Sequence, residues 1–384
     1  MMRLIKRGVS GTAGVLLLSG AASCQPIDEG PVALSGLAPA AQGWTMTVLA
    51  GGLEHPWGLA FLPGDEGILI TERPGRIRLF KDGALRGEPI GGVPPVLASR
   101  QGGLLDIALD PDFARTRLVY LTYAHGTVEK NNTRVARARF DGSTLSDLEV
   151  VFDVTPHKRG GLHFGSRMQF MPDGSLLVGL GDGFNYRDQA QDVGSHLGKI
   201  VRLRPEGGAF AGNPFADRGG ALAEVYSYGH RNIQGLALDR ASGRVWATEH
   251  GPLGGDELNL IEPGKNYGWP LATYGREYHG PRVSQKTSLP GMEDPKIVWT
   301  PVLAASGLMV YSGEAFPQWK GDIFAGGLMT REIRRIDIDA SGNIGRQESI
   351  AIQSRVRDVR EGPDGMIYVV TDEADGKLIR VSPK

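Results

Sequence analysis

The stretch HPWGLAFLPGDEGILITERPGRIRLF, residues 55–80, decides the fold of this chain. It holds two apolar runs that are separated by a turn rich in Pro, Asp and Gly, and a third strand-like run follows. Short apolar runs joined by Gly-containing turns are typical of antiparallel strands connected by hairpins. The stretch therefore predicts a β-meander.

The same pattern returns along the chain, and six such units can be counted. The other five units are residues 102–124, 166–183, 232–251, 306–328 and 356–381. A single meander cannot cover both of its faces, so repeated units must pack on one another. Radial repetition of four-stranded sheets is the β-propeller, and the sequence predicts an all-β propeller of six blades. We expect the strand WTMTVLA, residues 44–50, to complete the last blade and close the ring.

A solenoid or a β-sandwich is the alternative interpretation of these repeats. Turns of the P-D-G type stand at equivalent places in at least three units, and helical periodicity is nearly absent, which argues against both. Two long inserts, residues 184–228 and 271–305, interrupt the repeats. Inserts of this kind usually cover one end of a ring, so we expect them beside a site.

The first 23 residues have the order of an export signal. Arg3, Lys6 and Arg7 precede an apolar stretch of small residues at 9–22. The sequence thus predicts an exported, periplasmic protein with a signal at 1–23, a linker at 24–43 and a catalytic propeller at 44–384.

Cys24 is the only cysteine, so no disulfide can form within the chain. Its position after the signal resembles a lipoprotein cleavage site, where the lipidated thiol would tether the protein to a membrane; ordinary cleavage after Ala22 or Ser23 is the alternative. No second apolar run of about 20 residues is available to span a bilayer. The net charge of −1 gives no reason to expect a nucleic-acid partner.

In a propeller the residues just before each inner strand gather at one mouth of the central channel. Here these residues are Gln101, His163, Arg167, His230, Arg231, Asn232, Ser306, Arg355 and Arg357. Guanidinium groups bind carboxylates through two parallel hydrogen bonds. A mouth with several arginines therefore predicts a multiply charged anionic ligand or cofactor.

A second group of residues suits a hard cation. The segment HGPLGGDELNL, residues 250–260, offers backbone carbonyls at Gly251 and Pro252, followed by Asp256 and Glu257, and oxygen ligands are those that calcium prefers. The chain has no HExxH or CxxC motif for zinc. It also lacks G-x-S-x-G, a P-loop and a dinucleotide-binding glycine motif, which argues against nucleotide and nicotinamide chemistry.

Several of these segments together resemble one family. They are QGGLLDIALDPDF, HFGSR, YGHRNIQGLAL, TEHGPLGGDELNLI, KNYGWP and the RVRDV…PDG…YVVTD pattern. The combination is similar to the soluble pyrroloquinoline quinone (PQQ) dependent glucose and aldose sugar dehydrogenases, which are calcium-dependent six-bladed propellers. The likeness runs from about residue 45 to the C-terminus.

The resemblance implies roles for residues at the predicted mouth. His163 matches the base that takes the proton of the anomeric hydroxyl while hydride moves from C1 to the quinone. Arg231 matches the residue that polarises the quinone oxygen, and Asn232 a neighbouring contact to the cofactor. Gln101 matches a contact to a sugar hydroxyl.

The resemblance also implies a cofactor clamp and two calcium sites. Arg355 and Arg357 match residues that hold the carboxylates of PQQ. The implied calcium ligands are the backbone oxygens of Gly251 and Pro252 for an ion that bridges to the cofactor, and Asp256, Glu257 and Tyr267 for a structural ion.

Three positions depart from the glucose dehydrogenase pattern. Leu162 stands where those enzymes have Asp before the catalytic His, Val302 replaces a cofactor-contacting Thr, and Met329 replaces a cofactor-contacting Lys. These departures favour the broader aldose sugar dehydrogenase branch over the glucose enzyme, and they leave the affinity for the cofactor open.

Each of these assignments has a structural alternative. A buried His163 bonded to a backbone carbonyl, an Arg231 salt bridge between blades, or a solvated Arg at 355 or 357 would need no ligand, and Asp256 and Glu257 would then only flank a turn. His230 and His250 are expected to be structural. Two other functions also remain open, a calcium-dependent propeller lactonase and a non-catalytic sugar-binding propeller.

Overall fold

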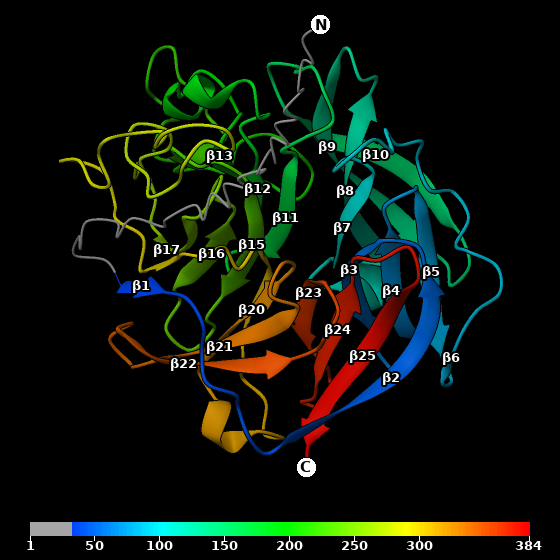
Figure 1. The fold of residues 1–384 in the computed structure, drawn as a ribbon. Coiled ribbons are helices and arrows are strands. Elements are labelled where there is room, and N and C mark those ends of the chain that lie inside the picture. Colours follow the sequence, from blue (N-terminus) through cyan, green and yellow to red (C-terminus); the bar gives the residue numbers. More distant parts are fainter. Residues whose placement is uncertain (1–32) are drawn as a thin grey trace, which may run out of the picture.

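The structure is a computed structural model and describes residues 33–384 (Figure 1). The predicted export signal, residues 1–23, and Cys24 lie outside the described residues, so export and lipidation stay predictions. Within residues 33–384 there is no helix of the length and apolar character needed to cross a membrane.

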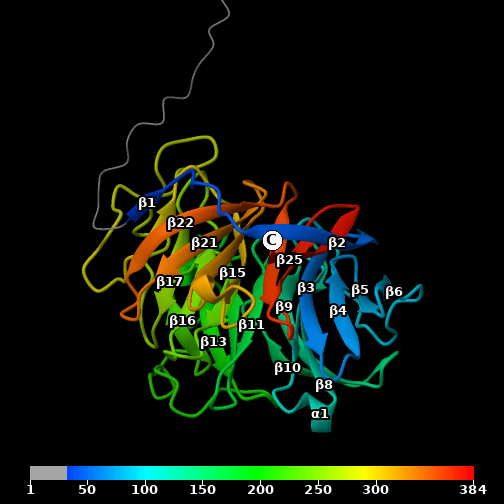
Figure 2. The ribbon, with the colours of Figure 1, turned by 90° about the horizontal axis from the view of Figure 1, so that it is seen from below.

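The described chain forms six antiparallel sheets arranged in a ring, which confirms the predicted six-bladed propeller (Figures 1 and 2). Blade one is β3 (Pro56–Leu62), β4 (Gly67–Glu72), β5 (Arg76–Lys81) and β6 (Ala84–Leu85). Blade two is β7 (Leu104–Leu109), β8 (Leu118–Gly126), β9 (Asn131–Phe140) and β10 (Leu145–Asp153). Blade three is β11 (Gly165–Phe170), β12 (Leu176–Leu180), β13 (Lys199–Leu203) and β14 (Val225–Tyr228).

The second half of the ring follows the same plan. Blade four is β15 (Ile233–Leu238), β16 (Val245–Glu249), β17 (Asp256–Ile261) and β18 (Ile297–Trp299). Blade five is β19 (Ala305–Val310), β20 (Ile323–Gly327), β21 (Glu332–Ile338) and β22 (Ile344–Ala351). Blade six takes β23 (Val356–Glu361), β24 (Ile367–Thr371) and β25 (Gly376–Pro383) from the C-terminus and β2 (Trp44–Leu53) from the N-terminal side. The antiparallel pairing of β2 with β25 closes the ring, as the sequence predicts.

Residues 33–43, which the sequence assigns to a linker, contact two blades. Strand β1 (Ala33–Ser35) pairs in parallel with β18 and makes blade four five-stranded. The chain then passes the outer strand of blade five, where Ala41 N donates to Ser349 O, before it enters β2. This segment therefore covers the outer edges of blades four and five (Figure 2).

Among the residues that the structure describes, helical structure is confined to three short segments between strands. They are α1 (Phe113–Thr116), η1 (Arg187–Gln191) and η2 (Pro317–Trp319). The predicted insert 184–228 contains η1 but also β13 and β14, which are strands of blade three. The prediction that this whole segment is an insert was therefore wrong. A long apolar strand pattern is absent there because β13 and β14 are only five and four residues long.

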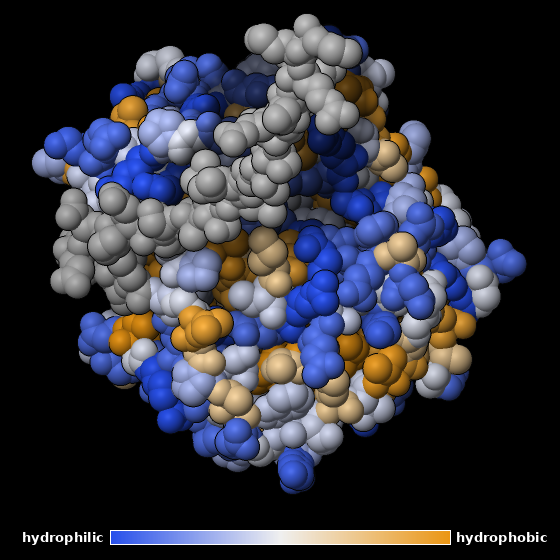
Figure 3. Space-filling view, in the orientation of Figure 1, coloured by the Kyte–Doolittle hydropathy of each residue, from blue (hydrophilic) through white to orange (hydrophobic). Residues whose placement is uncertain are grey.

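The hydrophobic core lies between neighbouring blades. Six apolar clusters of buried residues each join two adjacent sheets, so every blade packs on both neighbours. On the face of the molecule seen in Figure 3, hydrophilic residues predominate and hydrophobic ones are scattered among them. This distribution is what a ring with internal cores between its blades requires.

Each inner strand is irregular at its first residues. The register of β3, β7, β11, β15, β19 and β23 against the second strand of the same blade shifts within the first few pairs. Such bulges break the alternation of side chains along a strand and re-aim them. Six bulges at equivalent places therefore turn side chains toward one mouth of the channel.

Candidate active site

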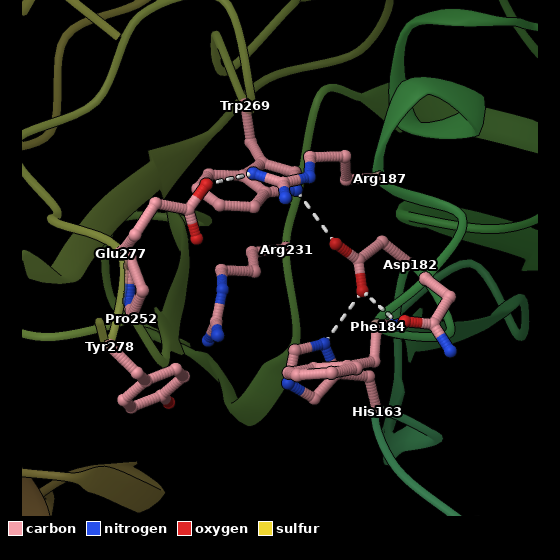
Figure 4. A pocket seen from close by; sticks show the side chains of 10 residues that line it. His163, Asp182, Phe184, Arg187, Arg231, Pro252, Trp269, Glu277 and Tyr278 are labelled. Atoms are coloured by element: carbon pink, nitrogen blue, oxygen red, sulfur yellow. Dashed lines mark hydrogen bonds and ion pairs between the residues drawn. The ribbon is translucent and has the colours of Figure 1, made fainter. Parts of the chain in front are cut away.

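A cavity of about 160 Å³ opens beside blades three and four (Figure 4). Its lining comes from the ends of these blades and from the loops that follow them; the residues are His163, Asp182, Phe184, Asn185, Arg187, Arg231, Pro252, Trp269, Glu277 and Tyr278. We call it cavity one. Both predicted inserts contribute to it, through 184–187 and 277–278.

His163 and Asp182 form a buried pair at one wall of cavity one. His163 Nδ1 lies 2.7 Å from Asp182 Oδ1, and both side chains are at most 5% exposed. Trp269 Nε1 donates to the second carboxylate oxygen of Asp182 at 2.8 Å, and the backbone N–H of Phe184 donates to the first. With Nδ1 as the donor to Asp182, Nε2 is left as an acceptor. No group within residues 33–384 hydrogen-bonds Nε2, so it is available to a ligand.

The backbone around His163 is held from both sides. Its φ of 52° lies in the left-handed region, which costs a non-glycine residue about 1–3 kcal/mol and is most often seen at functional sites. Gln101 Oε1 accepts the His163 backbone N–H at 2.8 Å, and Asn232 Oδ1 accepts that of Gly165 at 3.1 Å. A Cβ on Gly165 would lie 2.5 Å from Leu180, so only glycine lets this loop approach β12. The predicted residues Gln101 and Asn232 therefore both fix the position of His163.

Burial and charge keep His163 neutral. Burial lowers the pKa of His163 below its ordinary 6.5, and the positive charges of Arg231 and Lys158 lower it further, against the opposing effect of Asp182. Burial opposes ionisation of Asp182, but the hydrogen bond and charge of His163 and the charge of Arg231 outweigh it and hold the pKa of Asp182 below 3.8. The pair is thus a neutral imidazole oriented by a carboxylate near pH 7.

We expect this shift to be visible in a proton titration. Because the pKa of His163 is lowered, the ring stays neutral as the pH falls through 6.5 and takes a proton only below that value. The measurement is the pH dependence of the histidine ring signals by NMR, assigned by their loss in His163→Gln. In Arg231→Gln the midpoint should move upward, since one cation that opposes protonation is gone. A titration midpoint above 6.5 for His163 in the unmodified protein would contradict a lowered pKa of this ring.

Arg231 lies across cavity one from His163 (Figure 4). Its Nη1 donates to the carbonyl oxygens of His250 and Gly251, at 2.8 Å each, and the guanidinium lies 5.3 Å from the ring centre of Trp269. The side chain is buried, yet its Nε has no hydrogen-bond partner among the described residues. A fixed cation of this kind can stabilise negative charge on a bound group without rearranging.

A second cavity of about 190 Å³ lies at the mouth of the central channel, and we call it cavity two. All six blades contribute to its lining: Trp57, Arg73, Gln101, Leu105, Phe164, Gly165, Gln234, His250, Ala304, Leu328, Arg355, Arg357 and Asp372. Four of these residues follow or form the bulges of inner strands, namely Trp57, Leu105, Gln234 and Arg357. The bulges thus build this cavity.

Positive charge predominates in cavity two. Arg73, Arg355 and Arg357 face a single carboxylate, Asp372, which accepts from Arg357 Nη2 at 2.5 Å. Burial and the two neighbouring arginines lower the pKa of Arg73, while Asp372 opposes the shift. Three cations and one anion leave a net charge of about +2 to be balanced by a ligand.

Unpartnered polar atoms line the same region. Within residues 33–384, the buried His250 Nε2 and Arg357 Nε have no hydrogen-bond partner. Burial lowers the pKa of His250 to about 3, and Arg357 and Arg231 add to the effect, so this ring is neutral. Buried polar atoms without partners cost stability unless a ligand or water meets them. His250, expected to be structural, therefore faces the candidate ligand.

The predicted calcium ligands differ in how well they suit an ion. Both oxygens of Asp256 accept from backbone N–H groups, those of Gly251 and Ala304, at 2.8 and 2.5 Å. The hydroxyl of Tyr267 donates to Leu260 O and its ring stacks on His230, so only its carbonyl remains for a metal. Within residues 33–384 no group of three or more His, Cys, Asp or Glu could hold an ion by side chains alone.

Glu257 fits a cation better. It lines a small cavity together with Glu249, and burial and the charge of Glu249 raise the pKa of Glu257 well above 4.5. Two buried carboxylates without a cation between them repel one another. At the other predicted site, Gly251 O already accepts from Arg231, while Pro252 lines cavity one.

Several residues predicted at the mouth lie elsewhere. Arg167 is fully buried below cavity two, where its Nη1 lies 2.9 Å from Asp106 and 3.0 Å from Asp358. Ser306 is buried and donates to Val356 O. These two assignments were wrong because a bulge reverses which residues face the channel, and a sequence does not reveal its place.

The three positions that depart from the glucose dehydrogenase pattern line neither cavity one nor cavity two. Met329 is 63% exposed, and its neighbour Leu328 lines cavity two instead. Val302 lines neither cavity, whereas Ala304 does. Leu162 lines a separate hollow beside Phe184 and Asn185.

His230, expected to be structural, has the same type of partner as His163. Its Nδ1 lies 3.0 Å from Glu249, but its Nε2 is bonded to Ser227 Oγ, so no nitrogen is free. In both pairs the acid follows the histidine by 19 residues. This spacing is a repeated signal that the sequence analysis missed, and it would have identified Asp182.

Arg73 was also missed, because only residues before inner strands were considered. The dipeptides Thr71-Glu72 and Thr248-Glu249 end β4 and β16, and in Thr371-Asp372 the acid directly follows the last residue of β24. Charged residues thus also lie at the ends of second strands, near the mouth of the channel. Trp269, Phe184 and Tyr278 come from loops and had no repeat signal.

The sequence profile of a family described as Glucose / Sorbosone dehydrogenase matches residues 53–380. The chain is 42% identical over 345 residues to Aldose sugar dehydrogenase YliI of Escherichia coli strain K12, covering 88% of this chain and 92% of that protein. The crystal structure of the soluble aldose sugar dehydrogenase from Escherichia coli in the apo-form superposes with a TM-score of 0.85 at 42% identity, over 89% of this chain and all of that one.

A structure of the PQQ-bound form of aldose sugar dehydrogenase from Streptomyces coelicolor is also similar. Its TM-score is 0.73 at 32% identity, and the match covers 90% of this chain and 100% of that chain. The similarity thus extends over the whole ring.

Proposed function

Because the chain belongs to the glucose/sorbosone dehydrogenase family, and is thus a sugar dehydrogenase, we propose that it oxidises the C1 hydroxyl of aldoses to lactones with PQQ as the electron acceptor. The observation that carries the proposal is cavity two, where three arginines and one carboxylate lie beside the His163–Asp182 pair. PQQ has three carboxylates, which suits this charge.

The residues around cavity two fit the cofactor. Arg73, Arg355 and Arg357 would hold its carboxylates, and the unpartnered nitrogens of His250 and Arg357 would meet its other polar atoms. When bound, PQQ supplies a quinone that accepts a hydride from the sugar. The presence of PQQ in the Streptomyces coelicolor relative supports this assignment.

His163 would act as the general base. Its Nε2 faces cavity one as an acceptor, because Asp182 holds the proton on Nδ1. The lowered pKa keeps this nitrogen unprotonated at neutral pH, so it can take the proton of the anomeric hydroxyl. Asp182 then stabilises the imidazolium that forms.

Arg231 would stabilise negative charge beside the reacting carbon. Two carbonyl oxygens fix its Nη1, which leaves Nε and Nη2 for the ligand. Gln101 would act by fixing the backbone of His163, whose N–H donates to its Oε1, and the contact of Gln101 with a sugar hydroxyl remains what the resemblance implies.

Calcium is proposed at two places. Near the cofactor the backbone oxygens of Gly251 and Pro252 would hold an ion, and a structural ion would lie at Glu257, with Glu249 next to it and the Tyr267 carbonyl as a further ligand. The hard oxygen donors suit calcium. Asp256 would fix the loop of Gly251 through the backbone N–H groups that donate to it, and its remaining lone pairs would be available to the structural ion.

We expect Glu257→Gln to abolish thermal stabilisation by calcium. For the unmodified protein, calcium at about 100 times its Kd should add about 2.7 kcal/mol and raise the Tm by several degrees. In EDTA the variant should be at least as stable as the unmodified protein, since it removes a buried carboxylate whose pKa is raised. Thermal unfolding with calcium and with EDTA measures both effects. An equal calcium shift in both proteins would remove Glu257 from the site.

The proposed function is tested by reconstitution. The purified protein is treated with EDTA, then given PQQ with and without calcium, and the visible spectrum is followed on adding glucose or xylose. Loss of the oxidised quinone absorption only with calcium supports the dehydrogenase. If PQQ binds and no aldose reduces it, the substrate class is wrong. If PQQ does not bind, hydrolysis of a sugar lactone in calcium is the test of the lactonase alternative.

A further inference from the structure

Two aromatic rings are exposed at cavity one. Phe184 is 37% exposed and Tyr278 52% exposed, and both line the cavity. They come from different loops, one after β12 and the other in the segment between β17 and β18. In Figure 4 their rings lie on opposite sides of the Arg231 guanidinium, with His163 beside Phe184.

Phe184 is held in place by the catalytic pair. Its backbone N–H donates to Asp182 Oδ1 at 2.8 Å, the oxygen that also faces His163 Nδ1. Its ring packs edge-on against the His163 ring, with centroids 5.1 Å apart and an interplanar angle of 84°. The backbone has φ of 69°, a conformation that a bulky residue rarely adopts and that clusters at functional sites. The structure thus keeps an exposed aromatic ring beside His163 at a cost in free energy.

The rest of cavity one is polar. Arg187 Nη1 and Glu277 Oε1 lie 2.6 Å apart and connect the same two loops across the cavity (Figure 4). Asn185 and the Arg231 guanidinium complete this side. Charged and amide groups can bind several hydroxyls, while aromatic rings cover apolar C–H groups.

A sugar ring has both kinds of surface. Its hydroxyls radiate from the edge, and its faces carry C–H bonds. An open-chain polyol has the same hydroxyls but no fixed apolar face. Cavity one, of about 160 Å³, presents both kinds of lining, aromatic rings and polar groups.

We infer that Phe184 and Tyr278 form an aromatic clamp that binds the C–H faces of a cyclic aldose and holds its anomeric hydroxyl at His163 Nε2. This inference rests on the proposed function and names the residues that select the ring form of the substrate. The clamp stabilises the bound sugar equally in the ground state and in the transition state. Its loss therefore changes KM more than kcat.

The test compares Tyr278→Leu, Tyr278→Phe and Phe184→Ala with a matched control. Leu271→Ala is the control, because Leu271 lies in the same loop, is 49% exposed and lines neither cavity. KM and kcat are measured for glucose with the PQQ-loaded enzyme. In parallel, the apo-protein is titrated with 1,5-anhydroglucitol, a ring without an anomeric hydroxyl, and with sorbitol, by the fluorescence of Trp269 and by calorimetry.

Tyr278→Leu and Phe184→Ala are each expected to raise the KM for glucose and the Kd for 1,5-anhydroglucitol about 3- to 15-fold. Leu271→Ala should stay within twofold of the unmodified protein, and Tyr278→Phe, which keeps the aromatic ring, should raise KM and Kd less than Tyr278→Leu does. The kcat should change by less than threefold in Tyr278→Leu, and sorbitol should bind at least tenfold more weakly than the anhydro sugar.

Unchanged KM and Kd in both Tyr278→Leu and Phe184→Ala would overturn the clamp. A fall in kcat without a change in Kd for Phe184→Ala would mean that this ring only positions His163, which also overturns it. If the unmodified enzyme oxidises no aldose, the proposed function fails, and this result is distinct because the anhydroglucitol titration needs neither PQQ nor turnover.

Discussion

Replacing His163 with Gln is expected to lower kcat for aldose oxidation about 10²- to 10⁴-fold while PQQ still binds. Gln lacks a group that can take a proton near pH 7, whereas the neutral imidazole of His163 presents Nε2 to cavity one. Cavity two keeps its arginines in this variant, so PQQ affinity should change by less than threefold. Stopped-flow reduction of bound PQQ by glucose measures the chemical step.

Two further variants sharpen this prediction. Asp182→Asn should also reduce kcat strongly, because an amide no longer fixes the proton on Nδ1. His230→Gln is the matched control, since His230 has the same 19-residue pairing with Glu249 but no free nitrogen. It should lower the Tm and leave kcat within a few-fold. A His163→Gln enzyme with more than a third of the normal kcat would rule out His163 as the base.

Removing the two arginines of blade six should weaken PQQ binding by two to three orders of magnitude. Arg355→Gln combined with Arg357→Gln lowers the charge of cavity two by two units and leaves Arg73 opposite Asp372. Loss of a buried charge partner costs about 2–5 kcal/mol, or about 30- to 4,000-fold in Kd. Titration of the apo-protein with PQQ by calorimetry gives the Kd directly.

The salt dependence of this binding adds a second measurement. Binding to the unmodified protein should weaken with ionic strength, and the double variant should show a shallower dependence because fewer charges take part. Arg346→Gln is the control: Arg346 is 66% exposed and pairs with Glu348, away from both cavities. Equal PQQ affinity in the double variant and the control would place the carboxylates of PQQ elsewhere.

The sequence predicts the ring because the repeat itself determines the fold. Turns and apolar runs recur in each unit, and the strand at 44–50 pairs with the last unit as expected. The strands β1, β13, β14 and β18 were not predicted because they are short and carry no repeat signal. Their pairing depends on the sheets that are already present.

The site is predictable only in part, because the sequence does not show where the register of an inner strand shifts. Residues before inner strands do reach the mouth, and His163, Arg231, Arg355 and Arg357 line the cavities. Arg167 does not, because its side chain is buried below cavity two, where it pairs with Asp106 and Asp358. Asp182, Arg73 and Trp269 come from second strands and loops, where contacts between distant segments decide their positions.

The pairing that closes the ring also affects how the protein is made. Strand β2 pairs with β25, and Trp44 of β2 lies opposite Pro383 of β25. Because β2 is synthesised first, it can form these hydrogen bonds only after β25 has been synthesised. Until then blade six is incomplete, and the apolar cluster between blades six and one lacks one wall. An incomplete chain without Gly376–Pro383 would expose unpaired edges on both β2 and β24, which marks it for proteolysis.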